Sequence, residues 1–359
     1  MIKPILAQVF INPAISLNLS LVHWDLLIRQ ARRANILAKL AFFLEKNSFL
    51  KSVPDQPKKH LLSAQVHANR FALSLEWEIE CISQALIDQP IKLILLKGAA
   101  YHAAENITAD GRVFSDVDVL VPEEYLVAVE RALGKAGWMN LSFDPYEQQY
   151  YRKWMHEIPP LTNLKRQTSL DVHHNILPKT CEFYPDSSLL RDNAVQLNKK
   201  NIWVLSREDR VIHSATHLFH EGEFGNGFRD LSDLDSLLKE FSEYQDFWKH
   251  LVQRSVALQQ QISLYYALRY CSLIFETQIP GDAQREVEQG VPNPLKQTIM
   301  DFLFLRALMP DHSSCNGRWT GMARWLLYIR SHWLRMPLHL LVPHLLRKSW
   351  MRLSGKEVH

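Results

Sequence analysis

Two aspartates stand two residues apart in an otherwise apolar segment of the sequence. Asp116 and Asp118 lie between Phe114 and Val121, where the pattern predicts a strand. Side chains at positions i and i+2 of a strand point to the same face, so the carboxylates share one side, with Cα atoms roughly 6–7 Å apart. Two like charges this close repel each other, and a divalent cation relieves the repulsion. Mg²⁺ favours a few carboxylates together with substrate phosphates, so the pair is a candidate site for a divalent metal ion.

Apolar segments on both sides of this pair indicate the strands that would position it. The run Ile91–Leu96 predicts a strand that ends at a lysine–glycine pair, and a helix-like segment follows. A later strand, Ser169–Ile176, carries Asp171 and His173 on one face, since their spacing is again two residues. The sequence therefore predicts a third carboxylate within the same small sheet.

Three segments carry a resemblance to a known family. Leu96–Ala100, Arg112–Val121 and Leu170–His174 look like the motifs of the bacterial uncharacterised nucleotidyltransferase family. That family is a branch of the polymerase-β-like nucleotidyltransferase superfamily, whose pattern is a glycine turn, a DxD strand and a third acid on a later strand. The likeness runs in order over residues 22–240.

The resemblance implies a transferase that moves a nucleoside monophosphate from a nucleoside triphosphate (NTP) to a hydroxyl group of an acceptor and releases pyrophosphate. Asp116 and Asp118 would hold Mg²⁺, or Mn²⁺ in its place, against the triphosphate oxygens. Asp171 would complete a second metal site and help to deprotonate the attacking hydroxyl, as suits a two-metal displacement. The resemblance leaves the acceptor open among a small molecule, a protein and RNA.

The same resemblance implies contacts to the nucleotide. Gly98 would let backbone amides approach the phosphates at the start of a helix. We expect Lys97 and Arg112 to contact phosphate charge. The superfamily commonly follows its glycine with serine, whereas this chain has Ala99, so the missing contact is expected from the backbone or from Ser115.

The sequence allows more than one role for several histidines and for one later aspartate. His173 would orient Asp171, contact a phosphate or serve as a structural histidine. Asp230, in a helix that resembles one facing the catalytic sheet of the family, is expected to contact the substrate or support a residue that does. Three further histidines have the helical spacing of a metal site but lack the glutamate of the zinc-peptidase motif, which favours a helical lobe facing the cleft. They are His213, His217 and His220.

The order of the elements predicts an α+β fold, with a small mixed β-sheet as the nucleotidyltransferase core, N-terminal helices and a larger C-terminal helical lobe. The expected domains are residues 1–90, 91–205 and 206–359. In the first two we predict helices at 21–47, 60–88 and 122–136, and further strands at 138–143 and 158–164. In the last we predict helices at 207–221, 228–240, 243–256, 258–276, 293–308 and 318–353.

Composition favours a cytoplasmic protein. The 359 residues are 47% hydrophobic and 22% charged, with a formal net charge of +3, which is too small to indicate nucleic-acid binding by itself. The four cysteines are far apart and form no CxxC pair, so we expect neither a disulfide framework nor a cysteine zinc site. No run of 18 apolar residues predicts a transmembrane helix, and the N-terminus lacks the pattern of a signal peptide.

The C-terminal segment 318–356 combines tryptophans with many basic residues. Such a stretch packs on the helical lobe, or it lies on a membrane surface or an acidic partner. The sequence thus leaves two rivals to nucleotidyl transfer. One is a non-catalytic nucleotide-binding module, and the other is a protein that acts through these basic helices.

Overall fold

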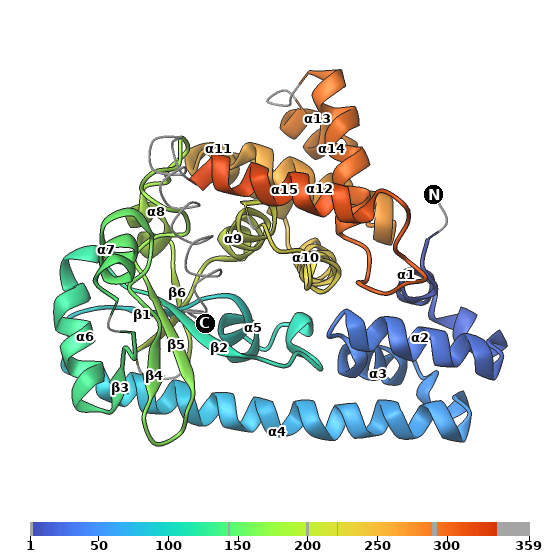
Figure 1. The fold of residues 1–359 in the computed structure, drawn as a ribbon, viewed down its shortest axis with the longest axis horizontal. Helices are drawn as coiled ribbons and strands as arrows, with labels where there is room; N and C mark the ends of the chain where they lie inside the picture. The colour runs from blue at the N-terminus through green and yellow to red at the C-terminus, as the bar shows by residue number, and fades with distance from the viewer. Residues whose placement is uncertain (1–2, 143, 199–200, 221, 289–292, 336–359) are drawn as a thin grey trace.

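The computed structural model describes residues 3–142, 144–198, 201–220, 222–288 and 293–335. One mixed β-sheet lies at one side of the molecule, with helices packed on both of its faces (Figure 1). The predicted α+β class, with a small mixed sheet between N-terminal helices and a larger C-terminal set of helices, is confirmed.

The sheet has seven strands in the order β3-β4-β5-β2-β1-β7-β6. Strand β2 pairs in parallel with β5, β1 pairs in parallel with β7, and the other neighbours are antiparallel. The predicted strands correspond to β1 to β5, whereas β6 and β7 were not predicted. The bounds are β1 Leu93–Leu95, β2 Asp116–Leu120, β3 Trp138–Met139, β4 Leu161–Asn163, β5 Ser169–His173, β6 Val195–Gln196 and β7 Ile202–Val204.

The two faces of the sheet belong to two apolar clusters. Val117 and Val119 of β2 pack in a cluster with the C-terminal half of the long helix α4 (Asp55–Ala85) and with α6 (Leu126–Lys135). Leu120 lies on the opposite face and joins a larger cluster formed with the C-terminal helices. Since alternate side chains of a strand face opposite ways, Asp116 and Asp118 lie on the face of Leu120.

The N-terminal part contains α1 (Ile5–Ile11), α2 (Leu21–Arg33), α3 (Leu37–Lys46) and α4. The prediction of one helix over 21–47 was wrong, because the chain breaks between α2 and α3. Asn35 has a φ of 55°, and the backbone N–H of Ile36 donates to the carbonyl of Ala31 at 2.9 Å. A left-handed residue followed by such a bond is a common helix ending, and asparagine tolerates it.

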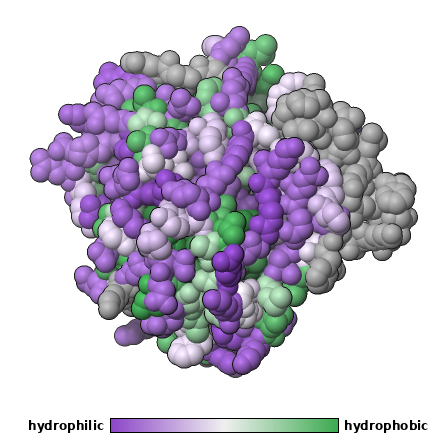
Figure 2. Space-filling view, turned by 90° about the vertical axis from the view of Figure 1, so that its left-hand side faces the viewer, coloured by the Kyte–Doolittle hydropathy of each residue, from purple (hydrophilic) through white to green (hydrophobic). Residues whose placement is uncertain are grey.

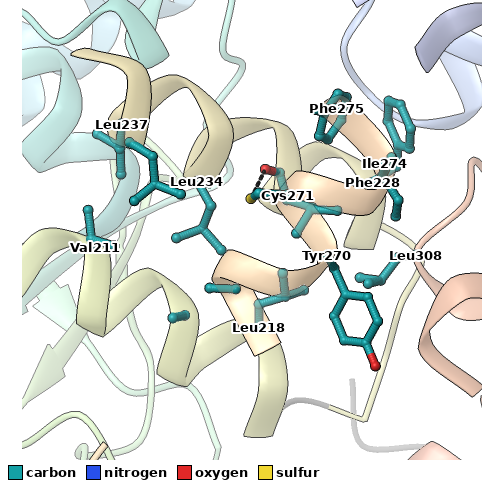
Figure 3. Packing of buried hydrophobic residues seen from close by; sticks show 14 of the residues in the cluster. Val211, Leu218, Phe228, Leu234, Leu237, Tyr270, Cys271, Ile274, Phe275 and Leu308 are labelled. Carbon is teal, nitrogen blue, oxygen red and sulfur yellow. Dashed lines mark hydrogen bonds between the residues drawn. The ribbon is translucent and has the colours of Figure 1, made fainter. Parts of the chain in front are cut away.

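The C-terminal part is helical, and its helices share a large apolar core with the N-terminal helices. Figure 3 shows side chains from three different helices, among them Val211, Leu234 and Cys271, packed within this core. The predicted helices are confirmed within the described residues, although α13 was not predicted, and residues 336–353 of the last one lie outside that range. The helices are α9 Arg207–His220, α10 Gly227–Phe241, α11 Phe247–Ala257, α12 Gln261–Phe275, α13 Gly281–Glu288, α14 Pro294–Ala307 and α15 Thr320–Arg335.

Three shorter helices complete the core around the sheet: α5 (Lys97–Ala103), α7 (Pro145–Trp154) and α8 (Ser187–Asp192). Figure 2 views the molecule from the end that carries α6 and α7, where most visible side chains are hydrophilic and apolar ones occur in small groups. All four cysteines are free. Among the described helices, none combines the length and the apolar character needed to cross a lipid bilayer.

Candidate active site

The register of two parallel strands gathers the predicted carboxylates. Asp118 of β2 is the direct partner of Asp171 of β5, and Asp116 is the partner of Ser169. Side chains of paired residues in a sheet point to the same face. The three aspartates therefore stand together on the side of the sheet that faces the C-terminal helices.

Asp118 is buried and held by two cationic partners. Its Oδ1 atom lies 2.7 Å from Nζ of Lys97 and 3.0 Å from Nε2 of His173. Burial by itself would raise the pKa of this carboxyl, but Lys97 and His173 outweigh it and lower the pKa well below its usual range. Asp118 is therefore ionised throughout the physiological range.

Asp171 differs sharply from its neighbour. Its Oδ1 atom is buried and has no hydrogen-bond partner among the described residues. Burial, together with the charges of Asp118 and Glu157, raises the pKa of Asp171 to about 7. A buried carboxylate oxygen without a partner is costly, and a bound cation would satisfy it.

The turn after β1 brings Lys97 and Gly98 to this face. Burial lowers the pKa of Lys97, but the charge of Asp118 outweighs it and raises the pKa above its ordinary value, so Lys97 stays charged. A Cβ atom at Gly98 would collide with the ring of Phe114, so only glycine fits without movement. Ala99 is buried in the apolar cluster behind the sheet. A serine there would place its hydroxyl among apolar side chains, which accounts for alanine at this position.

A cavity of about 200 Å³ opens beside these residues, between the sheet, the loop 111–115 and helices α9 and α10. Most of the predicted nucleotide-binding residues line it, whereas Asp171 and His173 are not among its lining. Ser115 donates a hydrogen bond to Asp116 at 2.9 Å. The lining includes Lys97, Gly98, Arg112, Ser115, Asp116, Asp118, His217, Arg229 and Asp230.

The two arginines of the cavity, Arg112 and Arg229, are paired with carboxylates of α10. The guanidinium of Arg112 forms an ion pair with Asp233 and lies 3.8 Å from Asp230. Asp233 also accepts a hydrogen bond from Lys39 of α3 at 2.8 Å. Burial and the charge of Arg229 lower the pKa of Arg112. Asp233 was not predicted as a site residue, although it lies three residues after Asp230 on the same helix.

His173 lies behind Asp118, away from the cavity lining. It contacts Asp118 rather than Asp171, and its Nδ1 atom lies 3.2 Å from a carboxylate oxygen of Glu157. Burial lowers the pKa of His173, but Glu157 and Asp118 outweigh it and raise the pKa above its ordinary value. Glu157 was not predicted as a site residue either, and its only mark in the sequence is the His156-Glu157 dipeptide just before a predicted strand.

The three histidines of α9 occupy different environments. His213 is buried, and burial together with the charge of Lys97 lowers its pKa well below 6.5. His217 lines the cavity, whereas His220 bonds to a backbone carbonyl of its own helix. Within the described residues, the one group of three donors close enough to share a metal ion is His156, Glu157 and His173.

A second, more open cavity of about 590 Å³ adjoins the first. The two share Val113, Phe114, Ser115, Asn226 and Arg229. The other wall of the second cavity comes from α2, α3 and α4. It presents basic and polar side chains, including Arg32, Asn35, His60, Ser63 and His67.

Comparison with known proteins gives one match. The model of a family described as "Uncharacterised nucleotidyltransferase" matches residues 20–276, which is more than half of the chain. The matched region runs from α2 to the end of α12 and contains every site residue named above. No curated protein and no solved structure shows a significant match.

Proposed function

Since the chain belongs to the uncharacterised nucleotidyltransferase family, we propose that it transfers a nucleoside monophosphate from an NTP to a hydroxyl group of an acceptor in a Mg²⁺-dependent reaction. The observation that carries the proposal is the side-by-side placement of Asp118 and Asp171, with Asp116 on the same face. This is the ordered carboxylate set that the sequence predicts.

The three carboxylates share one face and can hold a divalent cation, but their side chains must turn toward it, because among the described residues their oxygens do not lie close enough together to share an ion. Asp118 is ionised, Asp116 stands two residues before it, and Asp171 has a buried oxygen that lacks a partner. Such an all-oxygen donor set suits Mg²⁺. When bound, Mg²⁺ would neutralise charge on the triphosphate and on the departing pyrophosphate.

The side chains of the site have complementary tasks in the proposed reaction. Lys97, Arg112 and Arg229 line the cavity that would hold the triphosphate. Each is ion-paired with an aspartate, so phosphate oxygens would have to compete with these partners. Asp171 would help to deprotonate the acceptor hydroxyl, as the family resemblance implies, from its place beside Asp118 in the sheet. The hydroxyl oxygen then forms a bond to the α-phosphorus, the bond between that phosphorus and the bridging oxygen breaks, and pyrophosphate leaves.

The adjoining cavity gives the acceptor a route to the carboxylates. It meets the first cavity at Phe114 and Ser115, next to Asp116. Its polar and basic wall suits a hydrophilic acceptor, and a small molecule, a protein loop and an RNA end all meet that description. The acceptor class therefore stays open.

Removal of either strand carboxylate tests the proposal. We expect Asp116→Asn and Asp118→Asn to lower Mg²⁺-dependent transfer by about 100-fold or more, because metal binding contributes several kcal/mol to the transition state. Asp88→Asn, which changes an exposed aspartate near the end of α4, is the matched control and should keep wild-type transfer. Labelled NTPs and pyrophosphate release provide the measurement.

Two outcomes of this experiment contradict the proposal. Unchanged transfer in both variants would remove the carboxylates from the mechanism. Triphosphate binding by calorimetry without pyrophosphate release, in wild-type protein offered a range of hydroxyl acceptors, would instead favour a non-catalytic nucleotide-binding module.

A second candidate function is contact with a membrane surface, and the exposed face of α15 favours it. Large apolar residues recur along this helix at one-turn spacing and stay exposed, with Trp325 at 60% and Trp333 at 62%. Arg324 and Arg330 lie between them but are held by Asp311 and by the backbone carbonyl of Phe219, so the apolar stripe alone favours this candidate. A helix can insert such a stripe into a membrane interface. The stripe consists of Met322, Trp325, Leu326, Ile329 and Trp333.

Vesicle pelleting with a matched tryptophan control tests this second function. We expect wild-type protein to sediment with phosphatidylserine-containing vesicles and Trp325→Ser/Trp333→Ser to sediment several-fold less, since each exposed tryptophan would bury apolar area in the bilayer. Trp77→Ser removes a tryptophan that is 63% exposed on α4 and should sediment like wild type. Wild-type protein that stays in the supernatant would rule the function out.

A further inference from the structure

A cluster of metal-ligating side chains lies behind the strand carboxylates. His156 and Glu157 follow α7, and Glu157 forms a single β-bridge with His173 of β5. One donor atom from each of the three residues lies within 4.8 Å of the others. The rings of His156 and His173 are tilted toward each other, with centroids 5.2 Å apart.

The backbone holds this cluster in place. The backbone N–H of His174 donates to the carbonyl of His156 at 2.8 Å, and the N–H of Ile158 donates to the carbonyl of Val172 at 3.0 Å. His156 and Glu157 are thereby fixed on both sides to the strand that carries His173. A site built on paired strands keeps its geometry better than one on a free loop.

One ring nitrogen in the cluster is unexplained by the protein alone. The Nδ1 atom of His156 is buried and has no hydrogen-bond partner among the described residues. A buried polar nitrogen without a partner costs free energy, so such an atom calls for a ligand. Glu157 and His173 are the residues whose donor atoms lie close enough to share a metal ion with the His156 side chain.

His173 has the orientation of a histidine that binds a metal through Nδ1. Its Nε2 atom lies 3.0 Å from Oδ1 of the ionised Asp118, so Nε2 carries a proton and donates it. Metal-binding histidines commonly donate their second N–H to a carboxylate, which fixes the ring and strengthens the ligand. Nδ1 faces Glu157 at 3.2 Å. A metal there would displace the proton that the two groups share.

We propose that His156, Glu157 and His173 bind one divalent transition metal of the zinc type, separate from the Mg²⁺ of the aspartates. Two imidazoles and one carboxylate form a donor set that zinc favours, and three protein ligands leave one position open. Mg²⁺ prefers oxygen donors and would remain with the aspartates. Donor atoms on a tetrahedral zinc stand roughly 3.3–3.5 Å apart, so the cluster closes around the ion with shifts of about 1 Å.

The metal also fixes Asp118 through His173. With Nδ1 on the metal, the ring of His173 keeps its Nε2–H directed at Asp118. His173 is thus a positioning residue that links the transition metal to the carboxylate of β2.

Metal retention by the full-length protein tests the proposal. The protein is stripped with a chelator, given Zn²⁺ in the presence of excess Mg²⁺, desalted, and analysed for metal content. We expect about one equivalent of zinc in wild type and a more than 100-fold weaker affinity in His156→Gln and in Glu157→Gln, since loss of a ligand costs at least as much as loss of its supporting partner. His102→Gln is the matched control, because His102 also pairs with a glutamate, Glu76 at 3.0 Å, but has no third donor nearby in the described part of the chain.

A Co²⁺ spectrum and one further variant decide whether the metal is bound by the histidines or by the aspartates. Co²⁺ bound in place of zinc should show the ligand-field bands of a site with nitrogen ligands, and these bands should disappear in His156→Gln. Asp116→Asn should retain zinc, and loss there would place the metal on the aspartates instead. Wild-type protein without retained zinc, or unchanged affinity in His156→Gln and Glu157→Gln, would overturn the proposal. None of these readouts depends on nucleotide transfer, so the two proposals fail separately.

Discussion

Asp118 and Asp171 are neighbours in the sheet, yet their surroundings shift their pKa values in opposite directions. Lys97 and His173 keep Asp118 ionised despite its burial. Asp171 has no such partner, and burial together with nearby negative charge raises its pKa to about 7. Two carboxylates with separated pKa values take different roles in many active sites, one as a permanent anion and the other as an acid or base.

The raised pKa of Asp171 predicts a pH-dependent stability in metal-free protein. Between about pH 4 and pH 7 the folded protein holds a proton that the unfolded chain has released, so the free energy of unfolding falls as the pH rises through this window. Asp171→Asn removes this effect. We expect the variant to be more stable than wild type at about pH 8, by up to about 4 kcal/mol, with a much smaller gain near pH 4.

Thermal unfolding in a chelator, at both pH values, measures this difference. Asp88→Asn should show no such pH-dependent gain, because its carboxylate is exposed. Added Mg²⁺ should stabilise wild type more than Asp171→Asn, since a ligand that binds only the folded state shifts the equilibrium toward it. A variant that is less stable than wild type at both pH values would contradict the assignment.

At the scale of elements, a buried lysine joins the N-terminal helices to the wall of the cavity. Lys39 of α3 donates to the backbone carbonyl and hydroxyl of Ser232 and to Asp233, all on α10. Asp233 in turn pairs with Arg112 of the loop 111–115. Gly111 of the same loop, with a φ of 74°, lies against the backbone of α3, where no side chain fits. Helix α3, helix α10 and the loop therefore form one connected unit.

Two lysines pair with aspartates of α10, and substituting each in turn distinguishes the buried connection of Lys39 from an ordinary surface ion pair. Lys39→Met should destabilise the protein by about 2–3 kcal/mol, because it leaves buried acceptors on α10 unsatisfied. Lys239 is 50% exposed and pairs with Asp235 one turn away in α10. Lys239→Met should therefore lower the free energy of unfolding by less than about 0.5 kcal/mol. Urea unfolding measures both, and equal costs would contradict the structural role of Lys39.

At the scale of the whole molecule, one apolar cluster includes the N-terminal helices, one sheet face and the C-terminal helices. A second cluster, on the other face, contains α6 and the C-terminal half of α4. The carboxylates lie between the sheet and the larger cluster. Packing from distant parts of the sequence thus surrounds the site, while the division into three domains and the cytoplasmic location stay predictions.

Local patterns predicted much of this arrangement. Period-two alternation between clear breakers identified the strands that carry Asp116, Asp118 and Asp171, and helical periodicity identified most C-terminal helices. Strand β7 was missed because it has only three residues and no alternation to read. The end of α2 was missed because apolar periodicity continues through Ile36 and Leu37, and only the backbone angle of Asn35 marks the break.

Contacts between distant residues could not be predicted from one sequence. A shift of two residues between β2 and β5 would keep every side chain on its face but would separate Asp118 from Asp171, so alternation alone does not determine the register. The same applies to the pairing of Arg112 with Asp233 and of His173 with Glu157. These partners come from different elements, and tertiary packing selects them.

The long helix α4 has a mechanical consequence for any motion of this enzyme. Its 31 residues make a rod about 46 Å long that runs beneath both the N-terminal helices and the sheet (Figure 1). Its first half contributes Leu61 to the larger apolar cluster and its second half contributes Ile82 to the other. Because a straight helix resists bending, α4 keeps these two regions in a fixed position relative to each other. Opening and closing around a substrate is therefore not expected to change the position of the N-terminal helices relative to the sheet.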